Sequence, residues 1–130
     1  MALSPMTTTF RADGLPAGFV INAYGTGYVS VNGQRQTSPF ILEPQTGIAL
    51  LGEIRAQTIS ADDLRQILPL TPEVVLIGTG ERQIFLHPRI LAPLLDQRIG
   101  VECMGLAAAC RTYNILMGEG RRVVGAFLFD

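Results

Sequence analysis

Two apolar segments in the C-terminal half of the sequence constrain the fold more than any other feature. They are EVVLIG at 73–78 and RRVVGAFLF at 121–129, and their apolar positions are continuous rather than alternating with polar ones. A strand of this kind has apolar side chains on both faces, so both faces must be covered. The two segments therefore predict buried strands in a sheet that lies between other layers.

A first helix is expected to begin after Ser60, over the segment ADDLRQIL. The Ser60 hydroxyl can accept a hydrogen bond from an unpaired backbone N–H of the first turn, and Asp62 and Asp63 suit the positive end of the helix dipole. Pro69 and Pro72 are expected to end this helix, because proline has no backbone N–H to donate.

A second helix is expected to begin near Pro88 and to stop at Gly100, followed by a short strand, VECM at 101–104, and a third helix from about Leu106. Proline is favoured at the first helical position, and glycine is favoured after the last one. A strand, crossover helix and strand within one sheet run parallel, with the strand ends at the same edge. We therefore expect the GTG segment at 78–80 to lie near the start of the third helix.

The first third of the sequence is expected to be antiparallel β-structure. The segments FVINAY at 19–24 and YVSV at 28–31 are rich in β-branched and aromatic residues and are separated by the turn residues at 25–27. The dipeptide Asn32-Gly33 comes next. It suits a type I′ hairpin turn, in which both central residues need a positive φ.

Together these elements define the expected fold class, which is an α/β, three-layer single domain with a mixed central sheet. An additional N-terminal antiparallel β element and about three helices complete it. The 130 residues, 48% of them apolar, suit one domain with its own core. We expect residues 1–13 to form a flexible tail, because they are rich in threonine and lack periodicity, and residues 14–130 to form the globular domain.

Composition and charge argue against several classes of protein. Only 16% of the residues are charged and the formal net charge is -1, so we expect no nucleic-acid partner. We find no signal-peptide pattern and no apolar run long enough to span a bilayer, so we expect no membrane insertion and a cytoplasmic location. Cys103 and Cys110 are expected to be free thiols. With one histidine beside them, they give no metal-ligand spacing.

The segment ACRTYNILMGEG at 109–120 concentrates polar side chains within the third expected helix. Arg111 and Asn114 are three residues apart and could present one polar patch. Ala108 and Ile115 fall nearly opposite the apolar face, where they are either exposed or in contact with a second layer or subunit. The apolar face itself is an ordinary core stripe, formed by Leu106, Ala109, Cys110, Tyr113, Leu116 and Met117.

The sequence contains no complete set of residues for a known enzymatic mechanism. A nucleophilic Cys110 would need a base, and the only histidine, His87, stands before the second helix, where a helix-flanking role is favoured. Gly78 and Gly80 match the first two glycines of a dinucleotide fingerprint, but Gln83 occupies the place of the third and no helix is expected to follow. We therefore predict no cofactor and lean against an enzyme.

The segments EVVLIGTG at 73–80 and GVECMGLAAACRTYNILMGEGRRVVGAFL at 100–128 resemble the domain of unknown function four-nine-eight family, also called the Mth nine-three-eight fold. The run ACRTYN at 109–114 is the most specific part of the resemblance. The resemblance implies a three-layer fold with a mixed central sheet and no established enzyme activity. Relatives in this family include a mitochondrial assembly factor for respiratory complex I and an adipogenesis-associated protein.

Two classes of function remain open. The favoured one is a non-catalytic binding or assembly-type protein with a protein partner, which the resemblance links to respiratory complex assembly. The alternative is a small-ligand or anion-binding protein, or an enzyme, that uses the cleft between the GTG segment and the start of the third helix. Partner identity and oligomeric state stay open, a homo-oligomer included. No catalytic or metal residue is predicted, and the candidate binding residues are Gly78, Thr79, Gly80, Gly105, Cys110, Arg111 and Asn114.

Overall fold

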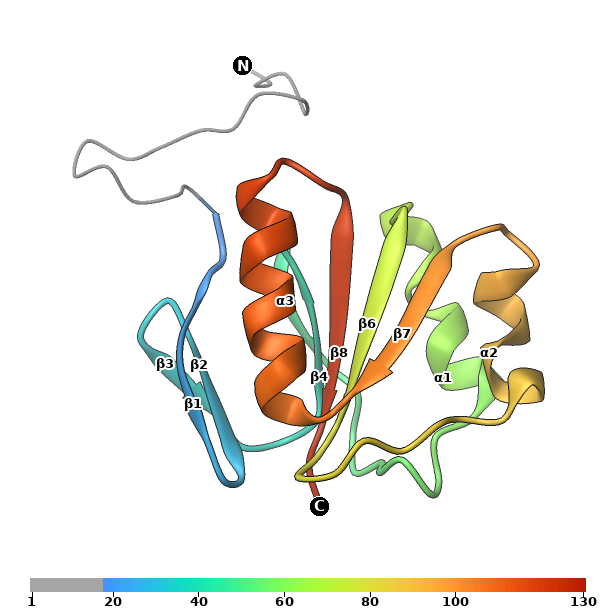
Figure 1. Cartoon of the computed structure of the whole chain (residues 1–130), viewed down its shortest axis with the longest axis horizontal. Coiled ribbons are helices and arrows are strands. Elements are labelled where there is room, and N and C mark those ends of the chain that lie inside the picture. Colours follow the sequence, from blue (N-terminus) through green and yellow to red (C-terminus); the bar gives the residue numbers. More distant parts are fainter. Residues whose placement is uncertain (1–17) are drawn as a thin grey trace.

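The structure, a computed structural model, describes residues 18–130. Its central element is a five-stranded sheet (Figure 1). Its strand order is β5-β4-β8-β6-β7. The tail expected at 1–13 lies outside the described residues. The strands of this sheet are β4 (Phe40–Glu43), β5 (Gly47–Leu50), β6 (Val74–Thr79), β7 (Gly100–Met104) and β8 (Val123–Leu128).

The sheet is mixed, as the sequence predicts. Strand β4 runs antiparallel to both β5 and β8, whereas β6 runs parallel to β7 and to β8. In the β6–β7 pair Gly78 lies opposite Met104, so the two strands end at the same edge. The expected proximity of the GTG segment and the third helix is therefore confirmed.

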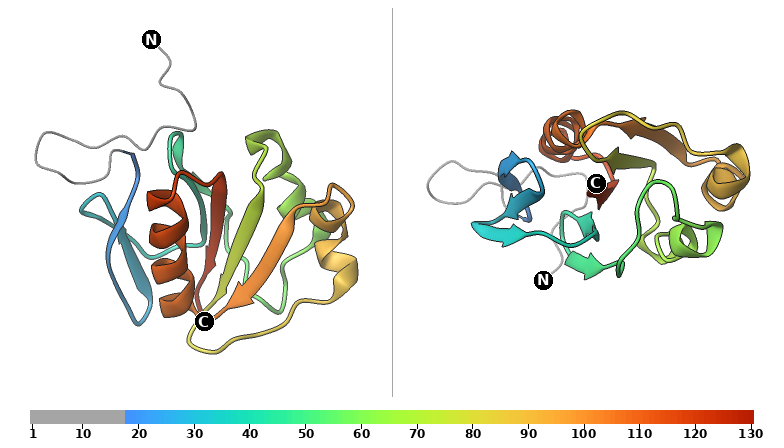
Figure 2. Two further views of the ribbon diagram at one scale, coloured as in Figure 1. Left: turned by 45° about the horizontal axis from the view of Figure 1, so that its top comes forward. Right: turned by 90° about the horizontal axis from the view of Figure 1, so that it is seen from below.

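Three layers form because successive side chains of the central strands point to opposite faces. On β8, Val123 and Phe127 enter one core, and Val124 and Ala126 enter the other. The first core is covered by α3 (Leu106–Gly118), and the second by α1 (Ala61–Arg65) and α2 (Pro88–Leu95) (Figures 1 and 2). The two apolar segments are thus buried strands, as expected. Within residues 18–130, no helix combines the length and apolar character needed to cross a bilayer.

The first helix is shorter than the sequence suggests. Ser60 caps it as expected, since its side chain accepts from Asp63 N while the Asp63 carboxylate accepts from Ser60 N. The helix nevertheless ends at Arg65, before either proline. Pro69 cannot donate to the Arg65 carbonyl, and the chain tightens into a 3-10 helix over Leu68–Leu70 instead.

The second helix also ends early. It begins at Pro88 with His87 as its N-cap, whose Nδ1 accepts from Arg89 N at 3.0 Å, which confirms the helix-flanking position of the histidine. It ends at Leu95 rather than reaching Gly100. Arg98 takes the left-handed conformation, with a φ of 58°, and so supplies the chain reversal that the sequence assigned to glycine.

A separate three-stranded antiparallel sheet packs beside α3 (Figure 1). The residues at 32 and 33 join its last two strands, and Asn32 and Gly33 have φ values of 49° and 84°. Two positive values confirm the expected type I′ turn. The strands of this small sheet are β1 (Ile21–Gly25), β2 (Tyr28–Val31) and β3 (Gln34–Gln36).

We expect Gly33→Val to lower the free energy of unfolding by about 1 kcal/mol or more, because a β-branched residue is strained at positive φ. The loss must come from the backbone, since a Cβ at Gly33 would have no atom within 4 Å. Urea denaturation measures the change, and Gly118→Val, equally open but without a positive φ, is the control for added bulk. An unchanged midpoint for Gly33→Val would show that the turn is not strained.

Candidate functional site

Helix α3 carries most of the candidate residues, and its inner face belongs to the core. Tyr113 is fully buried, and its ring meets that of Phe127 edge-on at 6.2 Å between centroids. Its hydroxyl donates to the Phe19 carbonyl oxygen at 2.7 Å, and burial raises the pKa of the phenol. The expected core stripe is confirmed, since Leu106, Ala109, Cys110, Tyr113 and Met117 are buried and Leu116 packs against the same cluster.

Cys110 is a packing residue rather than an accessible thiol. Its side chain is fully buried, and loss of hydration raises the pKa of the thiol to about 12, against a small opposing effect of the Arg111 charge. At neutral pH it is therefore protonated and a poor nucleophile. Cys103, on β7, is half-buried, and both cysteines are free.

We expect native protein at pH 7 to leave Cys110 unmodified by iodoacetamide over times in which Cys103 reacts. In denaturant both thiols should react, because neither is held in a disulfide. Mass spectrometry of the peptides around each cysteine gives the result. Rapid native alkylation of Cys110 would contradict the burial, and a thiol that reacts only after reduction would reveal a disulfide.

The side chain of Asn114 is hydrogen-bonded to strand β1. Its Oδ1 accepts from Ile21 N at 3.0 Å, and its Nδ2 donates to the Ile21 carbonyl oxygen at 2.7 Å. One side chain thus pairs both main-chain groups of Ile21, as a neighbouring strand would. Arg111 and Asn114 therefore do not form the polar patch that the sequence predicts, because the Asn114 amide is used inside the fold.

Thr79 holds the loop that follows β6. Its Oγ1 accepts from Ile84 N at 3.0 Å and lies 2.6 Å from the Arg82 carbonyl oxygen and 3.0 Å from that of Met104. The side chain is almost fully buried, with 2% of its surface exposed. These contacts connect the loop to the end of β7, so the hydroxyl positions the main chain rather than facing solvent.

The two glycines of the GTG segment have different places. Gly78 lies under α3, and a Cβ there would come within 3.2 Å of the Ala109 Cβ. Gly80 has a φ of 91°, and its carbonyl oxygen accepts from Leu106 N at 2.7 Å. This bond joins the loop to the first turn of α3, whose N-cap is Gly105.

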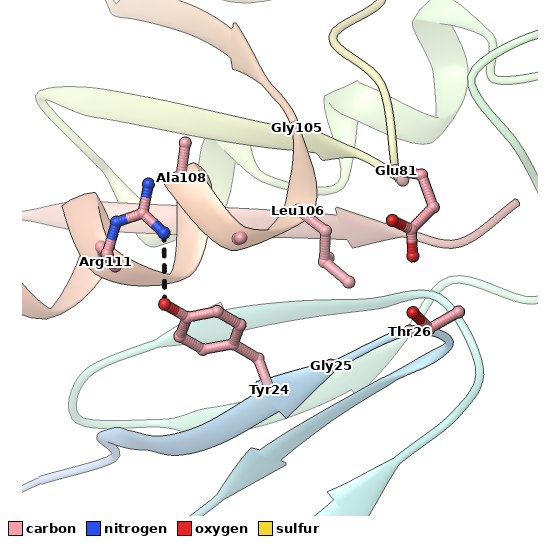
Figure 3. Close-up of a pocket in the computed structure, with 10 residues that line it drawn as sticks. Tyr24, Gly25, Thr26, Glu81, Gly105, Leu106, Ala108 and Arg111 are labelled. Carbon is pink, nitrogen blue, oxygen red and sulfur yellow. Dashed lines mark hydrogen bonds between the residues drawn. The ribbon is translucent and has the colours of Figure 1, made fainter.

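A groove lies between this junction and the first hairpin, with a cavity volume of about 430 Å³ (Figure 3). Three segments that are distant in sequence form it, namely the β1–β2 turn, the loop after β6 and the start of α3. Of the candidate residues, Gly80, Gly105 and Arg111 line it. The complete lining is Tyr24, Gly25, Thr26, Gly80, Glu81, Gly105, Leu106, Ala107, Ala108 and Arg111.

The polar groups of the groove are unevenly distributed. Arg111 Nη1 donates to the Tyr24 hydroxyl at 3.2 Å, and Glu81 and Thr26 lie toward the other end (Figure 3). In the described part of the chain, no group of three or more His, Cys, Asp or Glu side chains could hold a metal ion. The arrangement can therefore offer hydrogen bonds, one positive charge at Arg111 and one negative charge at Glu81 to a bound group.

Sequence reasoning missed the hairpin side of the groove and the residue Glu81 in the loop after β6. Tyr24, Thr26 and Glu81 were not among the candidates, because a turn and a loop give no periodic signal for what they face.

Comparison with known proteins assigns the chain to a family. Residues 21–128 match the family described as protein of unknown function (DUF498/DUF598), so the chain belongs to this family, as the resemblance suggested. The fold also matches a crystal structure of a protein from Bordetella parapertussis, with a TM-score of 0.83 and 46% identity over 88% of this chain and 98% of that one. A Bordetella pertussis protein described as a Mth938-like domain matches with a TM-score of 0.75 and 38% identity, over 85% of each chain.

Curated relatives include proteins with quite different names. The mouse protein named NADH dehydrogenase [ubiquinone] 1 alpha subcomplex assembly factor 3 is 33% identical over 114 residues, which cover 87% of this chain and 61% of that protein. The chain thus spans about three fifths of the length of this relative. A Francisella tularensis protein named 13 kDa major membrane protein is 30% identical, over 88% of this chain and 94% of that one.

Proposed function

We propose that this chain is a non-catalytic binding protein of the assembly type, which holds a protein partner on the face that contains the groove. One observation carries the proposal. Ile115 is 60% exposed and stands one helical turn beyond Arg111, next to the groove, so a large apolar side chain and a guanidinium share one outward face of α3. Arginine and aromatic residues such as Tyr24 are the residue types enriched in protein interfaces.

The named relatives support the assembly role. Several vertebrate proteins that carry the complex I assembly factor name match 83% or more of this chain. We extend from them the proposal that the partner is a subunit of a respiratory complex during its assembly. A location in the cytoplasm and a homo-oligomer remain predictions of the sequence.

A second candidate function is small-anion binding in the groove, and the position of the groove favours it. The cleft predicted between the GTG segment and the start of the third helix is closed by the hydrogen bond from Leu106 N to the Gly80 carbonyl oxygen, but the junction of the two segments forms one wall of the groove through Gly80, Glu81 and Gly105. An anion bound in the groove would lie at its Arg111 end, away from the Glu81 carboxylate, and needs no contact with Ile115. The role of Ile115 therefore separates the two candidates.

The test is affinity purification of the tagged protein at native expression, followed by quantitative mass spectrometry. We expect Ile115→Glu to lose the co-purified partner, because a carboxylate in place of the apolar side chain would be taken out of water against the partner, at a cost that pairing with Arg111 one turn away does not recover. Leu95→Glu is the matched control, since Leu95 is also an exposed apolar helix residue, 45% exposed, but lies in the layer across the sheet.

Loss of the partner with Leu95→Glu and its retention with Ile115→Glu would contradict the proposed face. No specific partner with the unmodified protein, combined with saturable stabilisation by inorganic phosphate in a thermal-shift assay, would favour the anion-binding alternative instead.

A further inference from the structure

Within residues 18–130, the bonds to one cationic side chain of the groove use only part of its hydrogen-bonding capacity. A guanidinium has five N–H donors, and the recorded side-chain bond of Arg111 is the one from Nη1 to the neutral Tyr24 hydroxyl. The ion pairs among residues 18–130 are those of Arg65 and Arg121, and neither includes Arg111. Carboxylates and phosphates match a guanidinium in charge and in bidentate geometry, and of the two a carboxylate is the group that an unmodified protein segment carries.

The walls next to Arg111 let a bound chain come close to the main chain of the protein. Gly25 and Gly105 face the groove from opposite sides, and Ala107 and Ala108 form the first turn of α3. None of these residues has a side chain longer than a methyl group. The volume of about 430 Å³ accommodates one or two side chains of a partner rather than a folded element.

Apolar surface lies on both sides of the guanidinium. The Tyr24 ring and Ala108 border it within the groove (Figure 3), and Ile115 follows one turn further along α3. An occupant that uses both apolar sides must continue past Arg111 in two directions. A free inorganic anion or a chain terminus bound at Arg111 would leave one of the two sides uncovered.

Glu81 limits the charge of the occupant. Its exposed carboxylate lines the same groove, away from Arg111 (Figure 3). A strongly acidic segment would place a second carboxylate near Glu81, and like charges repel. The groove therefore suits one acidic residue between apolar ones.

From these features we propose that the groove binds an extended segment of the protein partner, in which a single Asp or Glu side chain pairs with Arg111. Apolar residues that flank this acid contact Tyr24 on one side and Ile115 on the other. The inference rests on the proposed function, and it adds the chemistry by which the partner is recognised.

The test uses three probes with the full-length, ¹⁵N-labelled protein. They are the blocked peptide acetyl-Leu-Ala-Glu-Ala-Leu-amide, its glutamine counterpart and sodium acetate. We expect the glutamate peptide to shift the amide signals of Thr26, Gly105 and Ala108 in a saturable way, with a Kd about fivefold lower than that of the glutamine peptide. Arg111→Gln should remove the preference for glutamate, and Arg65→Gln, across the sheet, should keep it.

Three results would overturn the inference. They are equal affinity for the two peptides, shifts that lie outside the groove, and acetate that reproduces the shifts with the affinity of the glutamate peptide, which would mean anion binding alone. If any of these occurs while Ile115→Glu still loses the partner, the proposed function stands and only the recognition chemistry is wrong. If the peptide preference holds but no partner depends on Ile115, the binding chemistry stands and the assembly role fails.

Discussion

Tyr113→Ala is expected to lower the free energy of unfolding by about 3 to 5 kcal/mol, a large share of the stability of a domain of this size. The ring is fully buried between α3 and the central sheet and contacts Phe127 edge-on, so its removal leaves a cavity in the core. The hydrogen bond to the Phe19 carbonyl oxygen is lost as well. Urea denaturation followed by circular dichroism measures the change.

Tyr113→Phe separates the two contributions. It keeps the ring and removes only the hydroxyl, so we expect a loss of about 1 to 2 kcal/mol from the hydrogen bond and the Phe19 carbonyl left unpaired. A loss below about 1 kcal/mol for Tyr113→Ala would show that the ring is not part of the core. A functional role for this face of α3 would then have to be considered.

Asn114→Ala is expected to lower the free energy of unfolding by about 2 to 3 kcal/mol. The substitution removes both bonds to the main chain of Ile21 and leaves an N–H and a C=O group without that partner. The substitution should increase the rate of amide hydrogen exchange more in β1 than in β6, relative to the unmodified protein. The two bonds between Asn114 and Ile21 connect the small sheet to α3 and do not involve the central sheet. This local pattern distinguishes loss of the Asn114–Ile21 bonds from a general loss of packing.

Thr112→Ala, at a half-buried position of the same helix, is the control for the helix itself. It should change stability by no more than about 0.5 kcal/mol. Equal losses for Asn114→Ala and Thr112→Ala, or uniform exchange across both sheets, would mean that Asn114 does not anchor the small sheet.

The core of the fold could be predicted because its strands and α3 have strong local patterns. EVVLIG and RRVVGAFLF are apolar on both faces, and the stripe from Leu106 to Met117 has the helical period. Strand β5, Gly47–Leu50, was not predicted, because four residues at the edge of a sheet, two of them exposed, give little periodic signal. The ends of α1 and α2 were misplaced because tight turns ended them before the expected stop residues.

The candidate site was harder to predict, because one helix contributes residues to both the core and the groove. Arg111 and Asn114 are three apart and both polar, yet Asn114 pairs with Ile21 whereas Arg111 reaches Tyr24. Which polar side chain is used internally depends on where β1 lies, and that depends on contacts about 90 residues away in sequence. No pattern within the helix carries this information.

We propose that Arg111 acts at the surface while its neighbours on α3 build the fold, and the decisive measurement combines stability with partner recovery for Arg111→Ala. We expect its free energy of unfolding to stay within about 1 kcal/mol of the unmodified protein, while the recovered partner falls by at least about fivefold relative to Arg65→Ala. A loss of about 3 to 5 kcal/mol, comparable to that of Tyr113→Ala, would make Arg111 a structural residue, and full recovery of the partner would show that Arg111 takes no part in binding.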